Sequence, residues 1–350
     1  MRRKIRIAQY GIGHIASRIT RNLLDREGVE IVAAFARNPA QIGRDLGEVT
    51  ETGTVGLAIS NSADAVQIMK DRGVDLCFST IQGSLDGQKP VYVDSALAGA
   101  NCISICGAGY WPWAYPNLVE IVNEMDALYK EHNVSLFCGG YQDLYWSSLI
   151  TALSGGFYSI KSIRGIMTNI YDDGYAEWAI RGHGVGYTQD AFREKFGNDA
   201  GGFVTMPGDP NGWLANELGL HITSHNMYMR PVIAEEELNL PKTGIRVPVG
   251  NTVGSCLGDV TETEEGITLE FAYRGKAPTR GDDECNNKWR IEGEPNMSMT
   301  LTETDGQELT ASTQINRIPD VINARPGYLM SRDMPVNRYK ARPLNEYIND

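Results

Sequence analysis

The sequence of 350 residues has no long apolar run and no excess of positive charge. No apolar stretch approaches the ~20 residues that a membrane-spanning helix needs, and the N-terminus lacks the apolar core of a signal peptide. A net charge of −12 disfavours a nucleic-acid partner, because binding to a phosphate backbone needs a positive surface. We therefore expect a cytoplasmic protein with no membrane segment and no nucleic-acid partner.

Paired metal and disulfide motifs are also missing. The six cysteines form no CxxC pair and mostly stand in apolar, strand-like stretches, which is typical of reduced thiols in a cytosolic core. His221 and His225 lie four residues apart on an expected helix, but they lack the HExxH pattern and a clear third ligand. We expect no metal, and we interpret the two histidines as polar residues that line a substrate cleft.

The N-terminal stretch contains a strand, a glycine turn, a helix and a second strand. Ile5–Tyr10 is an apolar strand pattern, the turn reads GIGHIA over 11–16, and Val29–Phe35 is the second strand. In a dinucleotide-binding unit Gly11 permits the tight turn, Gly13 lets a pyrophosphate approach the backbone, and the helix N-terminus binds the phosphates. The predicted cofactor contacts in this turn are Gly11, Ile12, Gly13, His14 and Ile15.

The end of the second strand indicates which dinucleotide binds. An NAD-preferring enzyme usually carries Asp or Glu at this point, where the carboxylate binds the ribose 2′-hydroxyl. This chain has Arg37 there and no carboxylate. Because a guanidinium pairs with a 2′-phosphate, we predict NADP as the cofactor, with NAD as the alternative. The plainer interpretation of Arg37 is a solvated loop residue.

The next strands continue a doubly wound pattern. Val74–Ser79 reads as a buried strand, and its carboxyl end, with Ser79 and Thr80, should lie beside the cofactor ribose. Cys102–Ile105 is the following strand and opens into Cys106, which we place near the nicotinamide.

A Gly-rich and then aromatic loop follows Cys106. Trp111, Trp113 and Tyr115 fit one wall of a substrate pocket, and they fit a hydrophobic plug between domains equally well. Tyr110 in this loop is a candidate proton donor to a carbonyl oxygen.

The last strand of the first domain, Val134–Cys138, is followed by two further candidates. Tyr141 is a second phenol that could donate to a carbonyl, and Asp143 lies where a catalytic carboxylate would face the same crevice. Asp143 also fits an N-cap for the helix expected over 144–153.

From about Ser159 onward, helical and strand patterns mix. We expect a helix over Gln189–Phe196, helical periodicity over 213–232 and 235–238, and His183 on a flexible loop that could close over a substrate. Successive strands with turn signals between them predict a mostly antiparallel sheet. The expected strands cover 160–170, 245–253, 266–273, 289–291, 298–301 and 309–315. A short helix is expected over 317–327.

We therefore predict an α/β fold. An N-terminal Rossmann dinucleotide-binding domain covers 1–150, an α+β domain with a mostly antiparallel sheet covers 151–315, and a C-terminal segment covers 316–350.

Three stretches carry a family resemblance: GIGHIA over 11–16, IEGEP over 291–295 and, most specifically, NRIPDVINARPG over 316–327. They resemble 2,4-diaminopentanoate dehydrogenase and the related amine dehydrogenases, within the dihydrodipicolinate-reductase-like Rossmann proteins. The resemblance implies a homodimer that interconverts amines and ketones with ammonia and NAD(P)H. It also implies that the C-terminal segment returns to the cofactor domain, with Pro319, Val321 and Asn323 near the nicotinamide.

One departure from the family concerns the amine chemistry. In the amine dehydrogenases a glutamate follows the strand that ends here at Cys106, whereas this chain has Gly107 and Ala108. Without that carboxylate an iminium loses its counter-charge and proton acceptor. Asp143 would then have to take its place.

Three functions follow as hypotheses. The first is an NADP-dependent oxidoreductase that transfers hydride to or from a small C=N or C=O carbon, with an amine and ammonia among its partners. The second is an ammonia-independent ketone or aldehyde reductase that relies on a tyrosine or histidine donor. The third is a regulator that binds NADPH without turnover.

Overall fold

The computed structural model describes residues 2–81, 84–114, 116–172, 177–197, 207–280 and 284–349, so that Tyr115 of the aromatic loop lies outside the described residues. The chain divides into two compact units. Unit 1 comprises Met1–Leu144 and Gln307–Asp350, and unit 2 comprises Tyr145–Gly306. None of the helices in the described ranges is long and apolar enough to cross a membrane.

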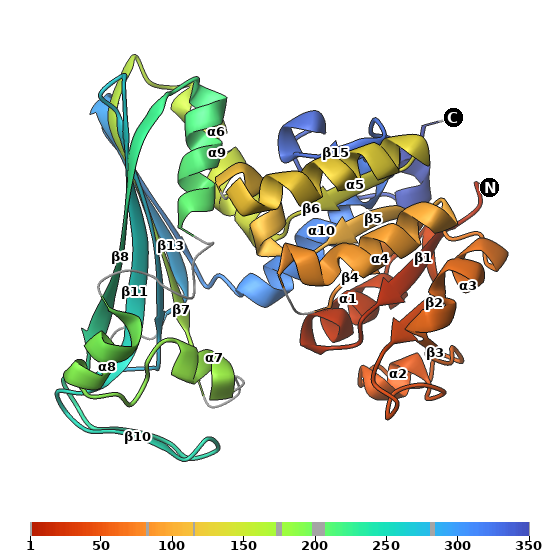
Figure 1. The fold of residues 1–350 in the computed structure, drawn as a ribbon, viewed down its shortest axis with the longest axis horizontal. Helices are drawn as coiled ribbons and strands as arrows, with labels where there is room; N and C mark the ends of the chain where they lie inside the picture. Colours follow the sequence, from red (N-terminus) through yellow and green to blue (C-terminus); the bar gives the residue numbers. More distant parts are fainter. Residues whose placement is uncertain are drawn as a thin grey trace. The chain divides into compact units, whose positions relative to one another are not determined.

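Unit 1 is built on a parallel sheet with the strand order β15-β6-β5-β4-β1-β2-β3 (Figure 1). The strands are β1 (Ile5–Tyr10), β2 (Val29–Ala36), β3 (Ser60–Asn61), β4 (Leu76–Ser79), β5 (Asn101–Ser104), β6 (Ser135–Cys138) and β15 (Gly327–Leu329). Every residue of β4, β6 and β15 is buried, as expected for strands covered on both faces. The predicted Rossmann fold is confirmed.

Helices cover both faces of this sheet. The helices α1 (His14–Leu24) and α10 (Gly306–Ile322) share a core with Ile7, Phe78 and Phe137 on one face. On the other face α3 (Ala65–Asp71) and α4 (Leu85–Ala98) pack with Tyr10 and Phe35, and α5 (Val119–Glu131) lies against α4. The short helix α2 (Leu46–Val49) follows β2.

The C-terminal part of unit 1 corrects one expectation. Residues 309–315 are not a strand but belong to α10, which continues through the expected short helix to Ile322. The buried Ala311, Ile315 and Ile318 recur at helical spacing, and the alternation of small polar residues between them hid this stripe. After α10, β15 pairs in parallel with β6 and places Gly327 opposite Ser135.

Unit 2 is built on a six-stranded sheet with the order β14-β13-β7-β12-β11-β8. The strands are β7 (Ser159–Ile170), β8 (Ile222–Ile233), β11 (Thr252–Thr263), β12 (Thr268–Lys276), β13 (Asn286–Glu294) and β14 (Met297–Thr302). Only β7 and β12 pair in parallel, so the predicted mostly antiparallel sheet is confirmed. A short hairpin, β9 (Leu238–Leu240) and β10 (Ile245–Val247), extends from it.

One face of this sheet carries helices. The helix α9 (Gly208–Leu218) contacts β8, β11 and β12, and α6 (Leu149–Ser154) packs against α9 (Figure 1). The Trp146 ring packs against Phe271 of the same face at a tilt of 40°, with a centroid distance of 4.6 Å. Near the other end of the sheet lie α7 (Glu177–Gly182) and α8 (Gln189–Phe196), and α8 has the predicted bounds.

The helical periodicity expected over 213–232 is wrong beyond Leu218. Gly219 adopts a left-handed conformation with φ 69° and ends α9, and the chain then enters the edge strand β8. Met229 is the only buried residue of β8, so no buried face imposes strict alternation on this strand and its pattern resembles that of a helix. Residues 235–238 are likewise not helical, and β9 begins at Leu238.

Candidate functional site

The turn between β1 and α1 has the geometry of an anion-binding site. Gly11 has φ 91°, and a Cβ on it would lie 2.9 Å from Ile81 Cγ2, so only glycine fits there. Gly13 is the N-cap of α1, and a Cβ on it would meet no atom within 4 Å. The first turn of α1 contains no acidic residue, and Gly13 has no side chain to cap it. Its backbone N–H groups are therefore offered to a phosphate, and a dinucleotide fits this turn.

The neighbours of Gly13 are held by other parts of unit 1. Ile12 is buried and its carbonyl accepts from Gln41 Nε2 at 2.9 Å. His14 Nε2 lies 2.7 Å from Gln307 Oε1 at the start of α10. Ile15 packs against the core that α1 shares with α10.

Ser79 and Thr80 lie at the end of β4, next to this turn. Thr80 Oγ1 donates to the carbonyl of Gly11 at 2.9 Å and accepts from Gln9 Nε2 at 2.7 Å. Ser79 Oγ donates to Gln88 Oε1 at 2.6 Å. The Thr80 hydroxyl therefore fixes the position of the glycine turn, whereas the Ser79 hydroxyl joins the end of β4 to α4.

Arg37 is exposed and comes immediately after β2. It interacts electrostatically with the carboxylate of Asp94, which the sequence did not reveal. Asp94 of α4 accepts a hydrogen bond from Tyr10 Oη at 3.1 Å. Burial raises the pKa of Tyr10 to about 12. Burial also raises the pKa of Asp94, while the Tyr10 hydroxyl and the Arg37 guanidinium oppose that shift. Asp94 comes from the middle of a helix, so no local sequence signal links it to Arg37.

The chain after β5 forms a tightly packed aromatic turn. Cys106 is buried, and its N–H donates to Ser104 Oγ at 3.2 Å. Tyr110 and Trp111 are buried as well, and the Trp111 ring lies 5.4 Å from that of Trp113. This turn therefore presents an aromatic wall at the carboxyl end of β5.

Asp143 is anchored inside unit 1. It begins a π-helix, η5 (Asp143–Ser148), and its side chain is buried. The carboxylate accepts from the Gly140 N–H at 2.9 Å and from Ser331 Oγ at 2.6 Å, and Arg317 Nη2 lies 3.8 Å away. Burial raises the pKa of Asp143, although Arg317 and Ser331 oppose this shift. The two loop phenols, Tyr110 and Tyr141, are also buried.

Asn323, just after α10, binds the C-terminal tail. Its Nδ2 donates to the Tyr347 carbonyl at 2.7 Å, and its Oδ1 accepts from the Asn349 N–H at 2.8 Å. The side-chain amide thus joins the end of α10 to the tail. The Leu344 N–H of this tail donates to the Glu27 carbonyl just before β2, and β15 begins opposite the first residue of β6. Asn323 therefore lies at the amino ends of the strands, and its predicted place near the nicotinamide is wrong.

In unit 2, His183 is the centre of a buried aromatic and polar cluster. Its ring stacks on Tyr171 at 5.0 Å, and Nδ1 lies 2.8 Å from Ser255 Oγ. Tyr171 and Tyr273 share a hydrogen bond of 2.7 Å between their hydroxyls. Burial lowers the pKa of His183 to about 4, so the imidazole is neutral at neutral pH. Ser255 was not foreseen, because it lies on β11, 72 residues further along the chain.

His221 and His225 bind separate carboxylates rather than each other. They are not one turn apart on a helix, because His221 precedes β8 and His225 lies within it. His221 Nδ1 is 2.6 Å from Glu265 Oε1, and His225 Nδ1 is 2.8 Å from the buried Asp259. These hydrogen bonds raise the pKa of both imidazoles.

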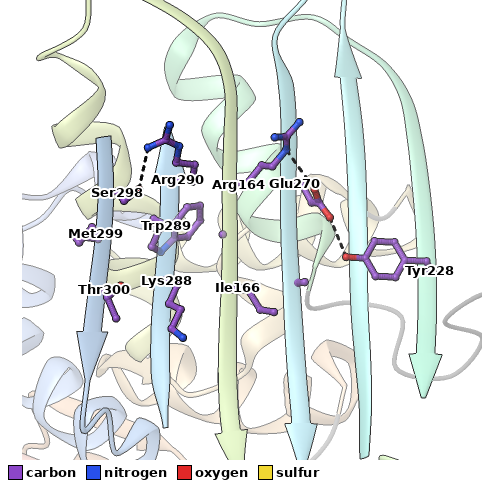
Figure 2. A pocket seen from close by; sticks show the side chains of 12 residues that line it. Arg164, Ile166, Tyr228, Glu270, Lys288, Trp289, Arg290, Ser298, Met299 and Thr300 are labelled. Carbon is purple, nitrogen blue, oxygen red and sulfur yellow. Dashed lines mark hydrogen bonds and ion pairs between the residues drawn. The ribbon is translucent and has the colours of Figure 1, made fainter. Parts of the chain in front are cut away.

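A shallow pocket lies over the strands β7, β12, β13 and β14 and contains none of the predicted site residues. Figure 2 shows Glu270 between Arg164 and Tyr228, with Tyr228 Oη 3.0 Å from Glu270 Oε1. Arg164 Nε lies 3.6 Å from Glu270 Oε2. These charges are satisfied by one another, and no anion-binding backbone comparable to the turn after β1 is present among the described residues that line this pocket.

Comparison with known proteins identifies the family. Residues 144–349 match the sequence model of the 2,4-diaminopentanoate dehydrogenase C-terminal domain. The chain belongs to the 2,4-diaminopentanoate dehydrogenase family. It is an NAD(P)-dependent oxidoreductase, as predicted.

The relatives resemble the chain along its whole length. The solved amine dehydrogenase from Mycobacterium smegmatis is 31% identical with a TM-score of 0.83, and the match covers 96% of this chain and 97% of that one. The 2,4-diaminopentanoate dehydrogenase of Acetoanaerobium sticklandii is 24% identical over 348 residues, covering 96% and 94% of the two chains. A probable dehydrogenase from Thermotoga maritima shares the fold, with a TM-score of 0.60, 14% identity and coverage of 94% and 92%.

Proposed function

We propose that this oxidoreductase prefers NADP and transfers a hydride to or from the C=N or C=O carbon of a small amine, ketone or aldehyde. The relatives named as diaminopentanoate and amine dehydrogenases support an amine as one side of the reaction. When bound, the dinucleotide supplies the hydride, and the chain binds and orients it. Gly11, Ile12, Gly13, His14 and Ile15 would hold the pyrophosphate. Thr80 would fix the turn around it, and Ser79 would lie beside the ribose.

The observation that carries the NADP preference is the exposed Arg37 at the end of β2. No carboxylate occupies positions 36–40, so nothing in the strand end itself would repel a 2′-phosphate. Arg37 is free to pair with that phosphate, although Asp94 competes for the same guanidinium.

A ketone or aldehyde reductase that needs no ammonia is the second candidate. The position that carries the family glutamate is Gly107 or Ala108, and the carboxylate of Asp143 is already bound by Ser331 and Arg317. A buried carboxylate held in this way is better suited to fixing the loop after β6 than to accepting a proton from ammonia.

The remaining assignments concern the substrate side and the assembly. We propose that Tyr110, Trp111, Tyr141 and the neutral His183 contact the substrate, and that Cys106 belongs to the nicotinamide end. His221 and His225 would be peripheral polar residues. We also propose a cytoplasmic location and a homodimeric assembly. Size-exclusion chromatography with light scattering would test the dimer.

Binding and turnover measurements test this function. NADPH and NADH are titrated against the wild-type protein and Arg37→Ala by following nicotinamide fluorescence. We expect wild type to bind NADPH more tightly, and R37A to weaken NADPH roughly 10-fold while NADH changes less than about twofold, since a charge-assisted hydrogen bond is lost. Oxidation of NADPH across a panel of small ketones, with and without ammonium, then separates the amine and carbonyl reactions. Tighter binding of NADH by wild type would contradict the NADP preference.

A further inference from the structure

Gln142 stands at the carboxyl ends of two neighbouring strands. It follows β6, which pairs with β5, and the Gly139 N–H after β6 donates to the Ser104 carbonyl of β5 at 3.0 Å. The glycine turn after β1 fixes the pyrophosphate, and Arg37 on the β2 side marks the adenosine half. The nicotinamide half of a dinucleotide therefore runs the other way, toward the ends of β4, β5 and β6.

Two glycines leave room for the Gln142 amide. A Cβ on Gly107, after β5, would find Gln142 Nε2 at 3.8 Å and no other atom within 4 Å. A Cβ on Gly140, after β6, would lie 2.9 Å from Gln142 Oε1 and 3.1 Å from Thr310 Cγ2. The amide thus lies between Gly107 and Gly140, neither of which has a side chain that could fill the space beside it.

The hydrogen-bonding groups of the Gln142 amide are unused within the described residues. Gln142 is half-buried, and its side chain makes no hydrogen bond to any residue of the described ranges. The adjacent Asp143, by contrast, is turned toward Ser331 and Arg317. A partly desolvated amide without a protein partner is costly unless water or a ligand satisfies it.

We propose that Gln142 hydrogen-bonds the reacting heteroatom of the substrate, and that the site selects an uncharged carbonyl or imine over a protonated iminium. This inference rests on the proposed function. Nε2 donates to a carbonyl oxygen or imine nitrogen, and Oε1 accepts from the alcohol or neutral amine of the reverse direction. A carboxylate would instead favour the protonated iminium, because it supplies a counter-charge.

Two variants and one control test the proposal. Gln142→Leu keeps the approximate size and removes both hydrogen bonds, and Gln142→Glu introduces a charge. Gln67→Leu is the control, because Gln67 is an exposed glutamine of α3 that binds Asp71. The readouts are the Kd of NADPH, kcat/KM for small ketones with and without ammonium, and the melting temperature.

We expect Q142L to lower kcat/KM roughly 10- to 100-fold, with the Kd of NADPH within about twofold of wild type and an unchanged melting temperature. Q67L should match wild type. Q142E should raise the ratio of ammonium-dependent to ammonium-independent turnover as pH rises through the titration of the new carboxyl group. A role confined to structure would not change that ratio.

Three results would overturn the proposal: Q142L within twofold of wild type in kcat/KM, a loss of NADPH affinity in Q142L, or an unchanged ratio in Q142E. These results differ from failure of the proposed function. In that case the wild-type protein itself would bind neither NADPH nor NADH.

Discussion

Each unit contains an arginine that faces two carboxylates, and the two triads differ in burial. In unit 1 Arg317 is buried between two carboxylates, with Asp143 at 3.8 Å and Asp320 at 3.6 Å. In unit 2 Arg164 also faces two carboxylates, Glu270 at 3.6 Å and Glu292 at 3.3 Å, but its side chain is 47% exposed. The same triad of charges is thus interior in one unit and on the surface in the other.

This difference reflects the two sheets. The parallel sheet of unit 1 is covered on both faces, so the charges that tie α10 to the loop after β6 have to be buried and paired. Unit 2 also buries a carboxylate, because the Asp259 side chain is 1% exposed and binds His225. The cluster around His183, by contrast, is held by neutral hydrogen bonds of His183 with Ser255 and of Tyr171 with Tyr273. Buried ion pairs position the loop after β6 in unit 1, whereas neutral hydrogen bonds organise the cluster around His183 in unit 2.

The largest expected effect comes from Arg317→Met. Removing the guanidinium leaves Asp143 and Asp320 buried beside an apolar side chain, although Lys340 still reaches Asp320 at 2.9 Å. We expect a loss of about 3–5 kcal/mol in the free energy of unfolding, measured by urea denaturation. A loss below about 1 kcal/mol would mean that this triad behaves like a surface pair.

His183→Gln tests whether the cluster around His183 stays neutral. In the wild type the folded-state pKa is about 4 and the reference value is 6.5, so the unfolded chain binds the proton first as pH falls. Stability is therefore complete above about pH 6.5 and declines toward pH 4, by roughly 3 kcal/mol.

The H183Q variant keeps a hydrogen-bonding group for Ser255 and has no such titration. Its loss of stability between pH 6.5 and 4 should be correspondingly smaller, as measured by denaturation at several pH values. Parallel pH profiles for the two proteins would show that folding leaves the pKa of His183 unchanged, and would contradict its burial as a neutral group.

The smallest effect is expected for Arg164→Met, the exposed counterpart of Arg317→Met. Because solvent screens its two ion pairs, the free energy of unfolding should change by less than about 1 kcal/mol. A loss as large as that of R317M would indicate that this face of the sheet is covered in solution, and the contrast between the units would then fail.

The sequence predicted unit 1 well because its signals are local. The turn at Gly11 and Gly13, the strand before it and the helix after it all lie within one βαβ unit. Helix α8 also has local signals, because the Thr188 side chain caps it by accepting from the Ala191 N–H, and Phe192 and Phe196 lie one turn apart.

The failures have physical causes. Gly219 was a sufficient signal to end α9, but the edge strand β8 that follows has no clean alternation. Long-range packing brings Asp94 to Tyr10 and His183 to Ser255. It also places Gln142 beside Gly107. No local pattern encodes such contacts.

The most direct test of the cofactor site is Gly13→Asp. Because a Cβ at this position meets no atom within 4 Å and the N-cap backbone is extended, an aspartate fits and would cap α1. Its carboxylate would occupy the N–H groups offered to the pyrophosphate and repel the phosphates. Gly155→Asp, beyond the end of α6 in unit 2, is the matched control and should bind NADPH as wild type does. We predict that G13D melts at or above the wild-type temperature and binds NADPH and NADH at least ~100-fold more weakly; unchanged binding of either dinucleotide by the folded variant would contradict the account.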